Sequence, residues 1–294
     1  MAAEGRFVRV LGGRRRGLWP ALRGDRARAA RSLLSWPLVL LLAIIGSSRE
    51  ATAAPPWVDR HLTLSAGVWA FDFGLGAGHV GGDANVSAAG ANAELVVGLT
   101  SRLELGVRTG ARFGGPAERA VRSDQYGRLY DRQTFGTGSE IFANPEVRVR
   151  GALVRGEVVE LALEGRLVAP FESGTRAGAM FGMPLAFHLG DRVRLDTGVY
   201  VPVVFTDPDA QVDLRLPLDL WIQASQRVWV GPMTGVVITD AGRTVSHTEL
   251  SLGVGMGVQV THAVDFKSMV LFPSVNRNGG RDFGAGVGVE LRVE

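Results

Sequence analysis

Apolar and polar side chains alternate along most of the chain after residue 54. The alternation is clearest in residues 102–113, 159–167 and 212–222, where every second position is apolar or small and most of the others are charged or glycine. A repeat of two residues is typical of a β-strand whose two faces meet different surroundings. No stretch of useful length repeats every 3.6 residues, as an amphipathic helix does. The pattern therefore predicts an all-β protein.

Two kinds of break separate the alternating stretches. Five are very short and have the polar and glycine residues of tight hairpin turns, at 100–101, 155–156, 190–191, 225–226 and 261–262. Six others are on average longer and richer in Gly, Asp and Asn, at 72–85, 114–143, 172–176, 206–210, 239–244 and 274–281. Within the first of these, residues 74–78 contain three glycines, and we expect a flexible loop there rather than a nucleotide-binding loop, because no helix follows.

Tight turns that alternate with more variable loops predict twelve antiparallel strands with both chain ends on the turn side. This layout resembles the bacterial outer-membrane β-barrels, in which short periplasmic turns face longer extracellular loops. The resemblance covers the chain from about His61 to Glu294 and is one of pattern, without a motif of any single member. It implies a transmembrane up-and-down barrel in the bacterial outer membrane, closed by pairing of a first strand near His61 with a last strand near Glu290.

Strand length and aromatic positions favour a membrane barrel over a secreted β-sandwich, which remains the alternative. The strands run to roughly a dozen residues, enough to cross a bilayer at a tilt, whereas soluble strands are typically about 5–6 residues long. Near the strand ends, phenylalanines occupy the alternate positions that belong to the apolar face, as expected for aromatic girdles at the two membrane interfaces. Those predicted near the loops are Phe113, Phe171, Phe181, Phe205, Phe272 and Phe283, and those near the turns are Phe187 and Phe266.

The first 54 residues have the features of a cleaved secretory signal peptide. An Arg-rich region precedes the apolar residues 36–45, and Ala51-Thr52-Ala53 supplies a cleavage site. A transmembrane anchor is the alternative, but the apolar stretch is shorter than the roughly 20 residues that a spanning helix needs. We therefore divide the chain into a leader, residues 1–54, and a barrel, residues 55–294.

The leader also explains the basic pI of about 9.9. It holds ten arginines and only three acidic residues, so residues 55–294 carry 22 basic and 26 acidic side chains, and a nucleic-acid-binding function is not expected. The absence of cysteine excludes a disulfide scaffold, a zinc-thiolate site and a cysteine nucleophile. No histidine pair has the spacing of metal ligands, so we expect neither a metal nor a cofactor.

The alternate positions that form the polar face of each strand predict a charged barrel interior. Its basic members are Arg108, Arg112, Arg148, Arg150, Arg166, Arg194, Arg215, Lys267 and Arg292, and its acidic members are Glu94, Glu104, Glu146, Glu160, Glu164, Asp196, Asp213, Asp219, Glu249, Asp265 and Glu290. Two interpretations remain open. The charges line a polar channel, or they form ion pairs that stiffen a narrow barrel and leave little free bore. The balance of signs argues against strong ion selectivity.

Two further features of the predicted interior concern its bore. Gly253, Gly255 and Gly257 share an inward parity, as do Gly284, Gly286 and Gly288, and close packing with tight curvature is favoured over room for a plug or an inward loop. The loop at 114–143 is a candidate gate, or a contact with lipopolysaccharide phosphate, although a plain solvated loop is equally compatible. Its candidate residues are Arg119, Arg122, Tyr126, Arg128, Tyr130 and Arg132.

These observations predict a porin-like channel for passive passage of small polar solutes, in contact with outer-membrane lipid and lipopolysaccharide. One alternative is a non-conducting structural or adhesion barrel, and a second is a lipid-modifying barrel enzyme. Barrel phospholipases carry a serine two residues after the catalytic histidine, but the residues two after the five histidines here are Thr63, Gly81, Gly190, Glu249 and Val264. We therefore expect no enzymatic activity.

Overall fold

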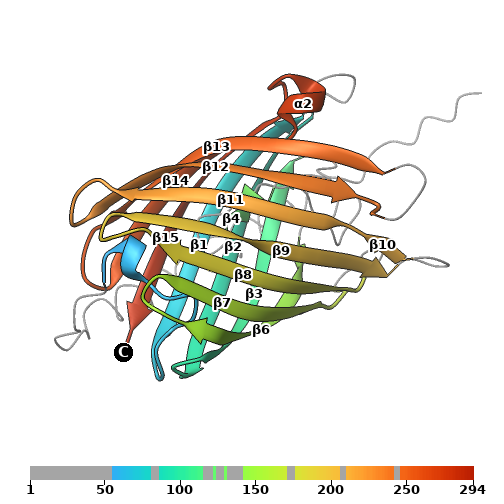
Figure 1. Cartoon of the computed structure of the whole chain (residues 1–294). Coiled ribbons are helices and arrows are strands. Elements are labelled where there is room, and N and C mark those ends of the chain that lie inside the picture. The colour runs from blue at the N-terminus through green and yellow to red at the C-terminus, as the bar shows by residue number, and fades with distance from the viewer. Residues whose placement is uncertain are drawn as a thin grey trace, which may run out of the picture. The chain divides into compact units, whose positions relative to one another are not determined.

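The computed structural model describes residues 55–80, 86–114, 122–123, 129–130, 142–170, 176–205, 210–241 and 246–294. The predicted leader, residues 1–54, lies outside this part of the chain. The described residues fold almost entirely as strands that wrap into a barrel (Figure 1).

Among the described residues, twelve long strands form the wall. In chain order they are β1 (Trp69–Val80), β2 (Val86–Thr100), β3 (Leu103–Gly114), β6 (Phe142–Arg155), β7 (Val159–Val168), β8 (Gly178–His188), β9 (Val193–Phe205), β11 (Leu214–Gln223), β12 (Val228–Thr239), β13 (His247–Gln259), β14 (Val264–Phe272) and β15 (Phe283–Val293). The short β10 (Ala210–Val212) pairs with β9 just before β11 begins. The remaining elements are a 3-10 turn, η1 (Trp57–Asp59), a two-residue hairpin of β4 (Arg122–Ser123) and β5 (Leu129–Tyr130), and α2 (Val275–Asn278).

The wall closes because its first and last strands pair. β1 is antiparallel to both β2 and β15, with Asp72 opposite Glu94 on one side and Glu290 on the other. Every wall strand thus has a neighbour on each edge, which leaves no open edge in the sheet. The predicted twelve-stranded antiparallel barrel is confirmed.

The start of the barrel wall differs from the sequence prediction. β1 begins at Trp69, not near His61, and residues 72–80 belong to this strand although they were predicted as a loop. The physical reason is that the glycines at 74, 76 and 78 are on the inward parity of β1, while Phe71, Phe73 and Leu75 are exposed on its outer face. Glycine in place of polar inward side chains hides the two-residue alternation and imitates a loop.

The outer face of the barrel is apolar. Leu163, Leu167 and Phe181, from β7 and β8, are at least half exposed, and similar side chains cover the other strands. The predicted girdle residues Phe205, Phe266 and Phe283 are also exposed there, whereas the side chains of Phe113 and Phe171 lie outside the described part. Exposed apolar area of this extent requires a lipid environment. The chain is a transmembrane β-barrel of the bacterial outer-membrane type.

No helix among the described residues is long and apolar enough to cross a membrane.

Candidate functional site: the barrel interior

The structure places the predicted interior charges on the inner face of the wall. Arg215 is half-buried, and the side chain of Arg112 lies outside the described residues. The other twelve principal candidates are buried, namely Arg108, Arg148, Arg150, Arg166, Arg194, Glu104, Glu146, Glu160, Glu164, Asp196, Asp213 and Asp219. A buried charge is costly unless it is paired, so their partners decide what the interior can do.

One continuous ion-pair network crosses four neighbouring strands, β2, β3, β6 and β7. Arg148 Nη2 lies 3.3 Å from Glu94 Oε1 and 3.1 Å from Glu104 Oε1. Arg150 pairs with Glu164, whose other oxygen lies 2.6 Å from Arg166 Nε. The carboxylates and guanidinium groups therefore neutralise each other along the wall, which favours a stiff inner surface of balanced charge.

A second network surrounds Lys267, the only lysine of the sequence. Its ammonium group pairs with Asp72 and lies 2.9 Å from Glu290 Oε2, which joins β14 to β1 and β15. Arg292 Nε is 2.5 Å from the other oxygen of Glu290. The sequence prediction missed Asp72 because its strand was taken for a loop. The alternation of Phe71, Asp72 and Phe73 was the available signal.

The segment before β1 enters the barrel instead of starting its wall. Residues 55–64, called here the N-terminal segment, include η1 and lie at the end of the barrel that carries the tight turns (Figure 1). Arg150 Nη1 donates to the Leu62 carbonyl at 3.0 Å, and Arg194 donates to the carbonyl of Arg60. The amide of Leu62 donates to Glu160 Oε2 at 2.8 Å. Interior charges of the wall therefore hold the backbone of this segment.

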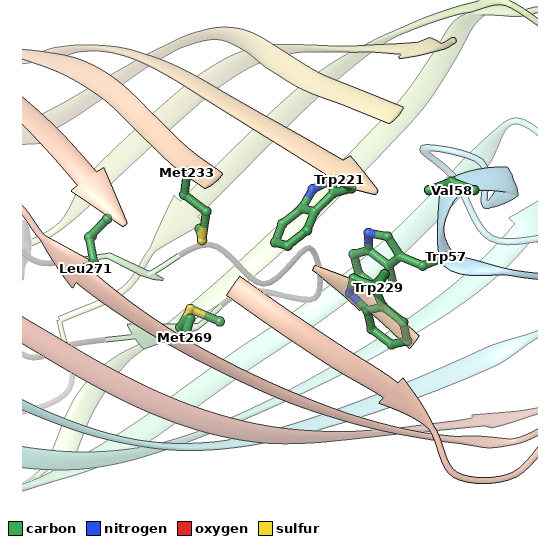
Figure 2. Packing of buried hydrophobic residues seen from close by; sticks show 7 residues of the cluster. All are labelled: Trp57, Val58, Trp221, Trp229, Met233, Met269 and Leu271. Atoms are coloured by element: carbon green, nitrogen blue, oxygen red, sulfur yellow. The ribbon is translucent and has the colours of Figure 1, made fainter. Parts of the chain in front are cut away.

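The side chains of the segment are equally well packed. Trp57 stacks on Trp229 with ring centroids 4.9 Å apart and an interplanar angle of 3°, and meets Trp221 edge-on at 6.1 Å. Figure 2 shows these rings together inside the barrel. Arg60 pairs with Asp265, and its guanidinium carbon lies 5.2 Å from the centre of the Trp57 ring. Desolvated cation–π and ionic contacts of this kind are among the stronger side-chain interactions.

Glycines on β13 provide the space for these tryptophans. A Cβ atom at Gly257 would lie 2.1 Å from Trp229 Cζ2, and one at Gly255 would lie 2.7 Å from Trp221 Cη2. Such distances are far inside van der Waals contact, so side chains must be absent at these two positions of β13 for the rings to approach this closely. Close packing is therefore the role of this glycine row.

Two histidines, one in the segment and one on β8, also take part in its docking, which the sequence did not predict. His61 Nδ1 lies 2.7 Å from Glu160 Oε1, and His188 Nε2 lies 2.9 Å from the same oxygen. His188 Nδ1 is 2.7 Å from the carbonyl oxygen of Val58. Both nitrogens of His188 thus face oxygen acceptors. The consecutive prolines at 55–56 and the lack of strict alternation from 55 to 64 were the sequence signals for a segment outside the wall.

The predicted gate loop is described only at β4 and β5. The two strands pair with Arg122 opposite Tyr130, and β4 lies against β1, β2 and β15. Arg119, Tyr126, Arg128 and Arg132 lie outside the described residues. Whether the loop restricts the bore stays a prediction.

Toward the loop end, the inner face of the wall contains a small cavity of about 80 Å³. Its lining combines apolar side chains, among them Met180, Met233 and Leu271, with Tyr200 and Asp219. Met233 and Leu271 belong to the same row of buried apolar residues as Trp221 and Trp229 (Figure 2). A group of buried apolar side chains therefore lies among the interior charges, and the alternation pattern did not predict this group.

No protein-family model matches the sequence, and no curated protein gives a significant match. Among solved structures, the chain is similar to the NanC porin, with 10% identity over 75% of this chain and 100% of that one and a TM-score of 0.49. The KdgM porin gives 8% identity over 76% and 99%, also at 0.49. The translocator domain of the autotransporter NalP from Neisseria meningitidis gives 11% over 92% and 98%, with a TM-score of 0.38.

Proposed function

We propose that this protein is a porin-like channel of the bacterial outer membrane for the passive passage of small polar solutes. The observation that carries the proposal is the contrast between the two faces of the wall. The outer face is apolar, while the inner face holds the charged side chains of at least nine strands. Charged groups on the inner wall of a transmembrane barrel provide a polar surface past which solutes can move.

The paired charges also suggest what kind of solute is favoured. Arg148, Arg150 and Arg166 are each within ion-pair distance of a carboxylate, and Lys267 contacts two. An inner wall of balanced charge attracts neither sign strongly, so we expect weak ion selectivity. Outer-membrane lipid is the partner that we propose for the apolar outer wall, and lipopolysaccharide is the partner that we propose for the loops.

A non-conducting structural barrel is the second candidate. The observation that favours it is the burial of the interior charges together with the N-terminal segment inside the bore. The two candidates differ in one measurable property, which is whether any state of the folded barrel passes ions.

Conductance in a planar lipid bilayer tests the proposal. The chain from Ala54 onward is refolded in detergent, and its folding is checked by the mobility difference between unheated and heated samples on a gel. Discrete conductance steps from folded protein support the channel. Folded protein that gives no steps, either intact or after removal of residues 55–64, supports the structural barrel instead.

A further inference from the structure

We infer that the N-terminal segment, residues 55–64, is a plug that closes the turn-side mouth of the barrel, and that the channel conducts when this plug withdraws. The inference rests on the proposed channel function. In barrels of this type the short turns face the periplasm. The plug therefore acts from the periplasmic side, where the last wall strand also ends.

The plug crosses the whole bore. Arg60 pairs with Asp265 at the start of β14, and the Leu62 amide donates to Glu160 at the start of β7. Five wall strands separate β7 from β14 in either direction around the barrel, so the two carboxylates lie on opposite walls. When hydrogen bonds, ion pairs and the ring contacts of Trp57 with Trp221 and Trp229 are counted together, side chains from eight of the twelve wall strands touch the segment.

Individual backbone N–H and C=O groups of the plug form hydrogen bonds with side chains of the wall. Val58 accepts from His188 and donates to Gln223 Oε1 at 3.5 Å, and Leu64 donates to Glu104 Oε2 at 3.0 Å. Together with the contacts of Arg60 and Leu62 described above, this satisfies buried polar groups that would otherwise cost free energy. Such complementarity indicates a defined docking site for this segment and not an accidental collapse into an empty lumen.

The connection to the wall allows the plug to leave without unfolding the barrel. Residues 65–68 link it to β1 and are held by Gly98, whose amide donates to the Val68 carbonyl at 2.9 Å. Gly67 has a φ of 81°, a conformation that favours glycine, and no atom lies near its missing side chain. Gly67 is therefore the point about which the plug turns. The wall strands keep all their ladder partners when it does.

Arg60 is the residue whose loss should open the channel most clearly. In the docked state its guanidinium group pairs with the buried Asp265, and withdrawal of the plug lets water solvate that carboxylate. Arg60→Gln leaves Asp265 buried beside a neutral group, which favours withdrawal. Breaking a buried ion pair shifts an equilibrium by about a hundredfold or more. We therefore expect the open fraction of Arg60→Gln channels to rise at least about tenfold.

Three preparations test closure by conductance: the chain from Ala54 onward, the Arg60→Gln variant and a chain without residues 55–64. The intact chain should show rare openings, and the other two should show frequent or lasting ones. A synthetic peptide of residues 55–64, added on the turn side, should block the shortened chain, and the same peptide on the loop side should block it less. Arg102→Gln, which changes an exposed arginine in a tight turn at the same mouth, is the matched control and should behave like the intact chain.

A second measurement follows the position of the plug without using conductance. The sequence has no cysteine, so Val58→Cys introduces a single thiol at a site that is 1% exposed. A charged thiol reagent should modify it about a hundredfold more slowly than Glu157→Cys, which lies exposed in a turn at the same end. Adding Arg60→Gln should speed the reaction of the Val58→Cys thiol.

The outcomes separate the inference from the function on which it rests. A protected Val58→Cys thiol with conductance that rises in Arg60→Gln and in the shortened chain supports both. Equal conductance of intact and shortened chains overturns the plug and leaves the channel standing. A protected thiol with no conductance from any preparation overturns the channel, and closure with it. A Val58→Cys thiol as reactive as Glu157→Cys overturns the docked segment itself.

Discussion

Gly257→Ala tests the packing that holds the plug against the wall. Gly257 lies on β13 with the Trp229 ring directly beside it, and the Trp229 ring in turn stacks on Trp57. The added methyl group would lie 2.1 Å from Cζ2 of Trp229 and 2.3 Å from Cε2, whereas ordinary contact begins at 3.4 Å. The ring must therefore move by about 1 Å or more, away from a wall that is otherwise closely packed.

The size of the effect follows from two opposing contributions. Overpacking a close-packed interior costs about 1–3 kcal/mol in the free energy of unfolding. Replacing glycine by alanine in a strand that has space for the methyl group gains about 0.5–1 kcal/mol instead. Gly165 on β7 supplies that second case, because no atom lies within 4 Å of a Cβ placed there. We expect Gly257→Ala to be less stable than Gly165→Ala by about 1.5–4 kcal/mol.

Urea unfolding of the refolded protein in lipid vesicles measures the difference, with tryptophan fluorescence as the signal. Both variants make the same chemical change in a wall strand, so their denatured states are affected alike. The reasoning is refuted if Gly257→Ala unfolds at the same urea concentration as Gly165→Ala, because the tryptophan rings would then not depend on the space at Gly257.

Three further changes probe the lipid face, the link to the plug and the interior charges. Leu163→Arg, at a side chain 50% exposed in the middle of β7, should cost about 2–4 kcal/mol, while Leu189→Arg, 53% exposed in a tight turn, should cost little in the same unfolding assay. Gly98→Ala would place a Cβ 2.0 Å from the carbonyl oxygen of Ser65, so it should displace residues 65–68 and speed proteolysis of the N-terminal region, and an unchanged digestion rate would contradict this. Lys267→Met leaves two buried carboxylates without their ammonium partner. It should therefore lower the free energy of unfolding by about 3–5 kcal/mol. A loss below about 1 kcal/mol would contradict this and would mean that the remaining arginines compensate.

The wall could be predicted well because its signal is local. Each strand exposes one face to lipid and one to the interior, so residues such as Leu163 and Glu164 differ sharply in polarity at adjacent positions. Turn residues then mark where each strand ends. The prediction was wrong only where this contrast is weak, in β1, because glycine takes the place of polar residues on the inner face.

The partners within the interior could not be predicted because they are not local. Arg60 and Asp265 are 205 positions apart, and Leu62 and Glu160 are 98 apart. Parity shows that a side chain points inward, but many inward carboxylates are compatible with each arginine. Only the register of neighbouring strands and the path of residues 55–64 decide which of them meet.

The sequence by itself determined the strand count, the alternation of turns and loops and the two faces of the wall, since these follow from repeats of two residues and from turn chemistry. Only the tertiary structure decided that the chain enters the barrel before its first strand and that Trp221 and Trp229 fill the space left by the glycines of β13, with Trp57 stacked on Trp229. Those features depend on closure of the barrel, which brings β7, β12 and β14 around one segment. A local pattern cannot encode which residues meet across that enclosed space.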